Sequence, residues 1–256
     1  MRFLLYNLRY GTGTGLRYHL PFPMAGFLKP TRDHLHRIVR FLKEMRPDLV
    51  GLVEIDSGSL LRSGRRDQAQ AIAAELGHWA CVESKYHPSS WAAAMPLMRK
   101  QANAVLAKER PQRVLRRYFD RGMKRLALEV EYSTFQVLLV HLALKRECRT
   151  AQIAQLAQWT REAIKPCLVA GDFNTFAGDA ELQPLHEAGL RNASTGQPSW
   201  PSWAPRHQID YILHGPGIEV TAFRVPTVQL SDHYPLVCDF RVRGAPEGGK
   251  PTRNEP

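Results

Sequence analysis

The segment CLVAGDFN, residues 167–174, joins a short apolar run to a polar turn. Residues 167–170 are small or apolar throughout, which predicts a strand buried on both faces. Asp172 and Asn174 follow where the chain leaves that strand. A carboxylate in such a place is most often a turn residue or a helix cap. It becomes a catalytic candidate if other strands end in the same way, because layered α/β folds place their sites at strand ends.

Polar residues border other apolar runs of the chain in the same manner. They are Asn7 after residues 2–6, Glu54 and Asp56 after residues 49–53, His141 in the run 137–142, Asp210 in the run 209–213, and Asp232 with His233 before residues 236–242. Each member alone has an ordinary structural explanation, and Asp56 fits a turn. The full combination is improbable by chance, so we interpret it as one site assembled from distant parts of the chain.

The rest of the pattern alternates short strands with amphipathic helices. Helices are expected over residues 31–45, 67–76, 147–164 and 180–188, and further strands over 103–107, 112–118, 124–131, 135–142 and 219–223. Mixed sheets with helices outside them indicate a layered α/β or α+β fold. The 256 residues are 44% hydrophobic, which suits one large domain. We expect this domain over residues 1–242 and a disordered tail over 243–256, where Gly, Pro and charges cannot bury a core.

The candidate residues favour a hard divalent cation and phosphoester chemistry. Oxygen ligands with few histidines select Mg²⁺, with Mn²⁺ or Ca²⁺ as alternatives, rather than zinc. The four cysteines lack any Cys-x-x-Cys spacing and are expected to be free thiols. Hydroxide is repelled by a phosphodiester, so hydrolysis needs charge neutralisation by a cation and an activated water. An Asp–His pair can supply the base.

The order Asn7, Glu54, His141, Gly-Asp-Phe-Asn at 171–174, Ile-Asp-Tyr at 209–211 and Ser-Asp-His at 231–233 resembles the endonuclease/exonuclease/phosphatase superfamily. The match runs from Asn7 to about residue 240, with supporting matches at Asn103, Arg149 and Gln152. The resemblance implies a four-layer α/β sandwich, with two central mixed sheets flanked by helices. It also implies a divalent-metal-dependent hydrolase of phosphoester bonds.

The resemblance implies a metal site at one end of the sandwich. Glu54, helped by Asn7 and Asp232, would hold the cation. Members of the superfamily commonly carry Gln before the metal-binding Glu, and this chain has Val53 there. Whether Asp56 compensates for the missing amide is open from the sequence.

The other matched positions are implied to be catalytic. His233, oriented by Asp210, would act as the general base for water or stabilise the transition state. His141 would hydrogen-bond a phosphate oxygen or protonate the leaving group. Asp172 and Asn174 would position the nucleophile and the scissile phosphate, in one version through a second metal.

A formal charge of +11 and a pI near 9.8 point to a polyanionic partner: nucleic acid, anionic lipid or a multiply phosphorylated small molecule. Basic residues are densest between Arg99 and Arg125, which suits a nucleic-acid backbone or is simply a solvated face. The apolar, glycine-containing insertion 11–30 is interpreted as a packed lid or as a segment that enters a membrane interface.

Three functions remain open. The first is a nuclease-like phosphodiesterase. The second is a phospholipid or sphingolipid phosphodiesterase, or a small-molecule phosphatase, at a membrane surface. The third is a non-catalytic polyanion-binding module, disfavoured because it would not need the whole set of polar residues. No apolar run approaches the roughly 18 residues of a membrane span, and no signal peptide is recognised, so a cytoplasmic monomer is expected.

Overall fold

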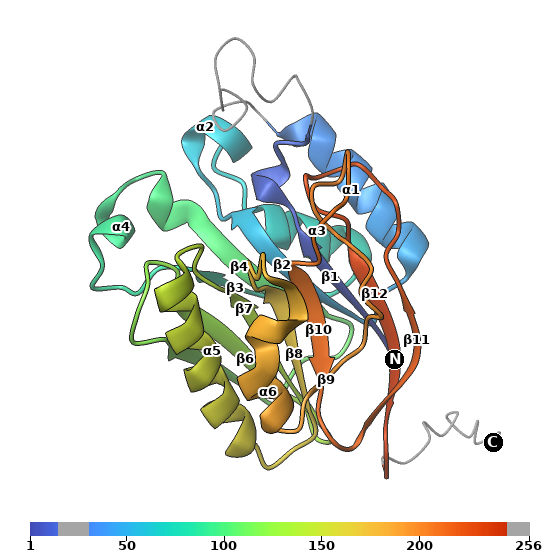
Figure 1. Ribbon diagram of the computed structural model, residues 1–256. Coiled ribbons are helices and arrows are strands. Elements are labelled where there is room, and N and C mark those ends of the chain that lie inside the picture. Colours follow the sequence, from blue (N-terminus) through green and yellow to red (C-terminus); the bar gives the residue numbers. More distant parts are fainter. Residues whose placement is uncertain (15–30, 245–256) are drawn as a thin grey trace, which may run out of the picture.

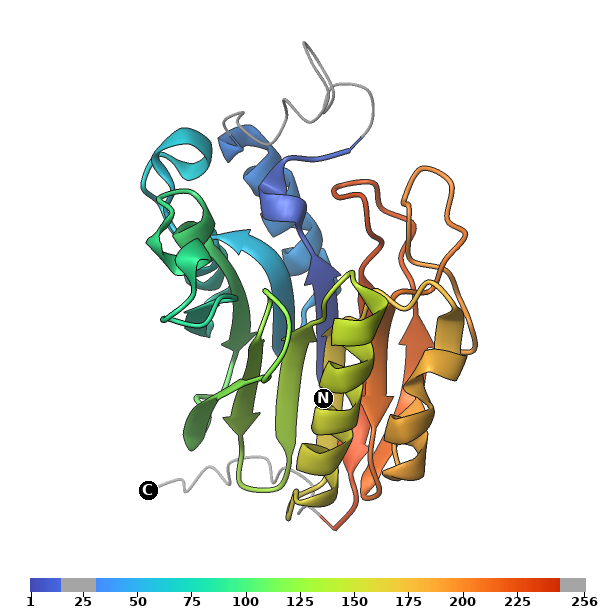
Figure 2. The ribbon, with the colours of Figure 1, turned by 60° about the vertical axis from the view of Figure 1, so that its left-hand side comes forward.

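Two mixed sheets stacked face to face form the centre of the computed structural model, which describes residues 1–14 and 31–244 (Figures 1 and 2). The first sheet has the order β11-β12-β1-β2-β4-β3: Ile218–Arg224, Leu236–Val242, Arg2–Asn7, Leu49–Asp56, Gln101–Ala107 and Trp79–Ser84. The second has the order β5-β6-β7-β8-β10-β9: Arg113–Tyr118, Leu126–Glu131, Gln136–His141, Cys167–Asp172, Asp210–His214 and Arg191–Asn192. The expected four-layer sandwich is confirmed.

Helices cover the outer face of each sheet. The long ones are α1 (Arg32–Met45) and α3 (Gln68–Leu76) on the first sheet and α5 (Arg146–Arg161) on the second, where α6 (Gln183–Glu187) lies beside α5 (Figure 1). Shorter turns are η1 (Arg9–Gly11), α2 (Leu60–Ser63), α4 (Trp91–Ala94), η4 (Met98–Lys100) and η5 (Gly178–Leu182). The four predicted helices are present with shifted ends, as α1, α3, α5 and the continuous stretch of η5 and α6. The other short turns were not predicted.

Alternating side chains of the strands bind the four layers together. In β1, Phe3 and Leu5 face the second sheet and pack with residues such as Leu139 in a core between the sheets. Leu4 and Tyr6 point to the opposite face and pack with α1 and α3. The second sheet forms a separate core with α5 and α6. Three cores between four layers explain why the predicted buried strands are apolar on both faces.

Two strands were missed by the sequence analysis. The six residues of β3 are all only partly buried, because β3 is the edge strand of its sheet. Its sequence WACVES therefore shows no clear alternation of apolar and polar residues. β9 has two residues, too few for any pattern. Thr31 precedes α1 at the N-cap position but does not cap the helix with its side chain, because its hydroxyl donates to the carbonyl oxygen of Arg62, at 3.3 Å.

Two sequence predictions, for the insertion 11–30 and for the tail 243–256, concern segments that lie mostly outside the described residues. Of the tail, Arg243 is described, and its backbone N–H donates to the carbonyl oxygen of Gly217 at 2.8 Å. The described part of the chain contains four free cysteines, as expected.

Gly171 is required where β8 approaches β7. Its φ is +154°, and a Cβ built there would lie 1.9 Å from the backbone carbonyl oxygen of Val140. We expect Gly171→Ala to lower the free energy of unfolding by at least about 3 kcal/mol, since the backbone of a paired strand must move. Gly215→Ala is the control, because its Cβ would meet the Cys167 carbonyl oxygen at an ordinary 3.4 Å. Equal urea-denaturation midpoints for the two variants would contradict this account.

Candidate metal centre and catalytic site

Strand pairing brings the sequence-predicted residues to one edge of the sandwich. β1 and β2 are parallel, with Asn7 opposite Val53, so that Glu54 follows beside it. β7 and β8 are also parallel, with His141 opposite Asp172. β10 is antiparallel to β8 and sets Asp210 opposite Asp172. The carboxyl ends of two parallel pairs and the start of β10 therefore meet at the same edge.

The backbone is strained at this edge. Glu54 has a φ of +54° and lies in a register shift between β2 and β4, and Asn174 also has a φ of +54°. Arg9 and Tyr10, just after β1, have φ values of +45° and +59°. Left-handed conformations cost non-glycine residues of the order of 1 kcal/mol or more, and such strain gathers at functional sites. The bulge turns Glu54 out of the regular alternation of β2.

His233 is held by an acidic partner. Its Nδ1 donates to Asp210 Oδ2 at 2.7 Å, and Ser199 Oγ donates to the same oxygen at 2.6 Å. The other ring nitrogen, Nε2, lies 4.0 Å from Asp172 Oδ2. Burial acts to lower the pKa of His233, but the charge and hydrogen bond of Asp210 outweigh it and raise the pKa to about 10. The ring therefore favours the protonated, cationic form in the metal-free protein.

Asp172 is the central carboxylate of the site. Its Oδ2 accepts from Asn7 Nδ2 at 3.0 Å and lies 3.5 Å from His141 Nε2. Its Oδ1 accepts the backbone N–H of Asn174 at 3.0 Å. Burial, followed by the charge of Asp210, raises the pKa of Asp172 to about 7. The carboxylates of Asp172 and Asp210 are thus held close together, and the nearby positive charge does not fully offset burial and their mutual repulsion.

Glu54 lies in a more cationic part of the same edge. Its Oε1 is 3.6 Å from Lys85 Nζ, 4.0 Å from Lys124 Nζ and 3.8 Å from His141 Nε2. Burial acts to raise the pKa of Glu54, but Lys85 and then Lys124 outweigh burial and hold the pKa below its usual value. Burial lowers the pKa of Lys85 itself to about 7.

These two lysines were missed as site residues. Lys85 follows β3, the edge strand that the sequence pattern does not reveal, and its side chain is only 3% exposed. Lys124, which also contacts His141, was counted only as part of the basic run. Burial, and then the charge of Lys124, lowers the pKa of His141 well below its usual value, so this imidazole is neutral.

Asn7, Asp232 and Asn174 complete the predicted set. Asp232 Oδ2 lies 3.4 Å from Arg9 Nε, and Asn7 Oδ1 accepts the backbone N–H of Arg9 at 3.0 Å. The side-chain amide of Asn174 donates to the carbonyl oxygen of Leu142 at 2.9 Å, which ties the loop after β8 to the loop after β7. All eight predicted site residues therefore lie along this edge.

The supporting positions organise the site from behind. Asn103 Oδ1 accepts the backbone N–H of Glu54 at 3.4 Å. Gln152 accepts from the Ala143 N–H and donates to the carbonyl oxygens of Arg121 and Lys124. Arg149 donates to the Leu144 carbonyl oxygen at 2.7 Å and pairs with Glu181. Gln152 and Arg149 thereby fix the loop that follows His141, and Gln152 also fixes the loop that carries Lys124.

Asp56 has a structural role and does not replace the missing glutamine side chain. Its Oδ2 pairs with Arg62 Nε at 2.7 Å, with both side chains fully buried. Its Oδ1 accepts the backbone N–H groups of Gly58 and Ser59. This is the turn role that the sequence indicated for Asp56.

The donor set fits a hard divalent cation. Ligand atoms of Asp172, Asp210 and His233 lie within 4.8 Å of one another. Asp210 Oδ1 is buried and has no hydrogen-bond partner among the described residues, so a lone-pair site is available there. This cluster differs from the set Asn7, Glu54 and Asp232 expected to hold the metal. Asn7 links the two sets through its contact with Asp172.

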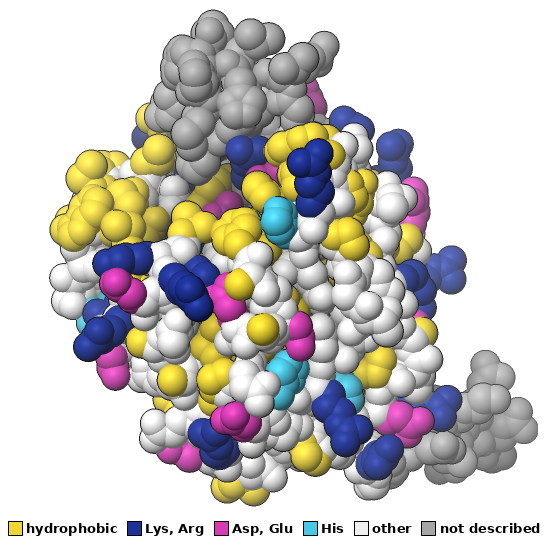
Figure 3. All heavy atoms as spheres, viewed as in Figure 1, with side chains coloured by type: hydrophobic (Ala, Val, Ile, Leu, Met, Phe, Trp, Pro, Cys, Tyr) yellow, Lys and Arg dark blue, Asp and Glu magenta, His cyan; other side chains and the backbone are white. Residues whose placement is uncertain are grey.

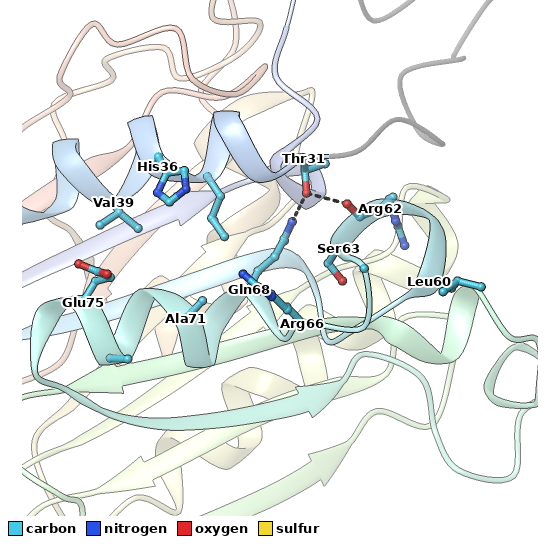
Figure 4. A pocket seen from close by; sticks show the side chains of 13 residues that line it. Thr31, His36, Val39, Leu60, Arg62, Ser63, Arg66, Gln68, Ala71 and Glu75 are labelled. Carbon is cyan, nitrogen blue, oxygen red and sulfur yellow. Dashed lines mark hydrogen bonds between the residues drawn. The ribbon is translucent and has the colours of Figure 1, made fainter.

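A cavity of about 630 Å³ lies away from these residues, between α1, α2 and α3 (Figure 4). Thr31, His36, Arg66 and Glu75 are among the residues that line it. In Figure 4 the side-chain amide of Gln68 reaches the hydroxyl of Thr31. None of the eight predicted site residues lines this cavity.

Solved structures share the fold with little sequence identity. An endonuclease/exonuclease/phosphatase from Beutenbergia cavernae has a TM-score of 0.70 at 19% identity, covering 97% of this chain and 73% of that one. A mannosyl-6-phosphatase from Bacteroides thetaiotaomicron has a TM-score of 0.70 at 13% identity, covering 94% and 99%. A humanised TDP2 of D. rerio has a TM-score of 0.68 at 16% identity, covering 94% and 99%.

Sequence comparison gives the family. The uncharacterised protein YbhP of Escherichia coli is 35% identical over 116 residues, which span 41% of this chain and 46% of YbhP. The chain thus matches a little under half the length of that relative. The model of the endonuclease/exonuclease/phosphatase family matches residues 4–233, which include all the predicted site residues. The chain belongs to the endonuclease/exonuclease/phosphatase family.

Proposed function

We propose that the chain is a divalent-metal-dependent phosphodiesterase whose site comprises Glu54, Asp172, Asp210 and His233 with their neighbours. The observation that carries the proposal is the convergence of two carboxylates, Glu54 of β2 and Asp172 of β8, beside the buried Asp210–His233 pair. Membership in the family supports phosphoester hydrolysis in general. The metal, the diester and the roles of single residues are the proposed part.

A cation held by Asp172 with Asn7, Glu54 or Asp210 would neutralise the charge on the non-bridging phosphate oxygens. Asp210 fixes the ring of His233 through Nδ1, so that Nε2 faces the side of Asp172 where the phosphate would lie. Held in this way, the ring would either take a proton from the attacking water or stabilise negative charge in the transition state. Lys124 and the neutral His141 lie beside Glu54, where they can hydrogen-bond a phosphate oxygen.

The simplest test uses a soluble diester. We expect hydrolysis of bis(p-nitrophenyl) phosphate with Mg²⁺ or Mn²⁺, abolished by EDTA and restored by added metal. The metal should also raise the melting temperature of the protein, because a ligand that binds only the folded state stabilises it. Absence of hydrolysis with Mg²⁺, Mn²⁺ and Ca²⁺, together with an unchanged melting temperature, would rule out the proposed metal centre.

The basic run now gives weaker support to a nucleic-acid substrate. Arg113 and Arg117 on β5 pair with Glu131 and Glu129 of the neighbouring strand β6, and Arg116 pairs with Glu83 of β3 in the other sheet. Basic charges that are neutralised by such ion pairs contribute little to phosphate binding. Nuclease-type activity stays a prediction, and metal-dependent plasmid nicking checks it. The monomeric state and the cytoplasmic location stay predictions as well.

A further inference from the structure

Exposed apolar side chains gather at the edge that carries the site. On the loops of the first sheet, Leu60 is 66% exposed, Trp91 63% and Met95 49%. Leu60 lies on α2 and Trp91 on α4, after the ends of β2 and β3, and Met95 directly follows α4. Figure 3 shows hydrophobic side chains grouped over α4. About half or more of each of these side chains is exposed and therefore available to a partner.

The second sheet contributes a matching set. Met123, Leu144, Phe176 and Trp203 are each at least 44% exposed and lie on loops at the same edge. The other exposed large hydrophobic residues of the described chain are Met1 and Ile164. Both lie at the opposite edge, where β1 and β8 begin. We call the seven side chains at the site edge the apolar rim.

Exposed basic residues accompany the apolar rim. Arg65 and Arg66 follow Leu60, Arg99 follows Met95, Arg121 precedes Met123, Arg146 follows Leu144, and Arg206 follows Trp203. No helix of the described residues is long and apolar enough to cross a membrane. Apolar side chains next to Lys and Arg are the combination that binds at the surface of a membrane with anionic lipids.

We propose that the apolar rim docks on an anionic lipid bilayer, with the site edge facing the lipid headgroups. Four of its seven members, Leu60, Met95, Met123 and Leu144, are aliphatic, and aliphatic side chains do not stack on bases as single-stranded nucleic acid requires. They do partition into the boundary between headgroups and acyl chains. If the proposed function holds, docking presents a headgroup phosphodiester to Asp172 and His233.

The test is co-sedimentation with vesicles of phosphatidylcholine and phosphatidylglycerol. We expect binding that weakens as salt rises and is much weaker with phosphatidylcholine alone. The double variant Trp91→Asp with Met95→Asp should bind at least about tenfold more weakly, because it replaces apolar anchors with repelled charges. Ile164→Asp is the matched control, since Ile164 is 99% exposed at the opposite edge; it should bind like the wild type.

Two results would contradict the docking proposal. The first is absence of binding to anionic vesicles at low salt, and the second is equal binding by the double variant and the wild type. Rim-dependent binding of single-stranded DNA without vesicle binding would assign the apolar rim to nucleic acid instead. Hydrolysis of the soluble diester is measured on the same proteins and should be unchanged in the rim variants. Vesicle binding without hydrolysis in any protein would refute the proposed function while leaving the docking intact.

Discussion

His233→Ala is expected to lower kcat on a soluble diester by at least about 10²-fold, whether the ring acts as a base or stabilises charge. The structure leaves no substitute in its place. Asp210 and Ser199 are arranged around Nδ1 of this ring, whereas Nδ1 of the nearby His141 has no hydrogen-bond partner among the described residues. KM should change less than kcat if the ring acts mainly in the transition state.

Two companion variants separate catalysis from folding. Asp210→Asn should reduce kcat in the same direction, because it removes the charge that raises the pKa of His233. His186→Ala, on α6, removes a histidine that pairs with Asp179 away from the site, and should retain wild-type turnover. Melting temperatures show whether the variants are folded. Near-normal kcat in a folded His233→Ala variant would contradict the role proposed for the ring.

The fold could be predicted because its strands are buried on both sides. β2, β7 and β8 are covered by the other sheet on one face and by helices on the other, so they appear in the sequence as continuous apolar runs. Each of these runs ends in a polar residue of the site. Parallel pairing then brings those ends together, a step that sequence pattern alone does not give.

The residues that escaped prediction share a physical reason. Lys85 follows a half-buried edge strand without periodicity, and the charge of Lys124 is indistinguishable by sequence from that of the solvated arginines near it. Only burial separates them: the Lys124 side chain is 18% exposed, against 63% for Arg113. Likewise, the strand register decides which glutamates of other strands pair with the β5 arginines. The register cannot be derived from residue composition.

Asp172→Asn is expected to lower the metal-dependent kcat by about 10²-fold or more. The same substitution is expected to stabilise the metal-free protein. Burial and Asp210 raise the pKa of Asp172 to about 7 in the folded chain. An unfolded aspartate titrates near ~3.9. The folded state therefore binds the proton more tightly, and the free energy of unfolding falls as pH rises from about 4 to about 7.

The asparagine removes that charge but weakens the hydrogen bonds from Asn7 and Asn174. We therefore expect a gain in the free energy of unfolding of about 1–3 kcal/mol at pH 8 without metal, and almost none near pH 4. Added Mg²⁺ or Mn²⁺ should raise the melting temperature of the wild type but not of the variant, reversing their order. Asp179→Asn, at an exposed carboxylate on η5, should show neither effect. Two outcomes would contradict this prediction: a variant that is less stable than the wild type at pH 8, or a variant that metal still stabilises. Either outcome would mean that Asp172 has a structural role and does not bind the cation.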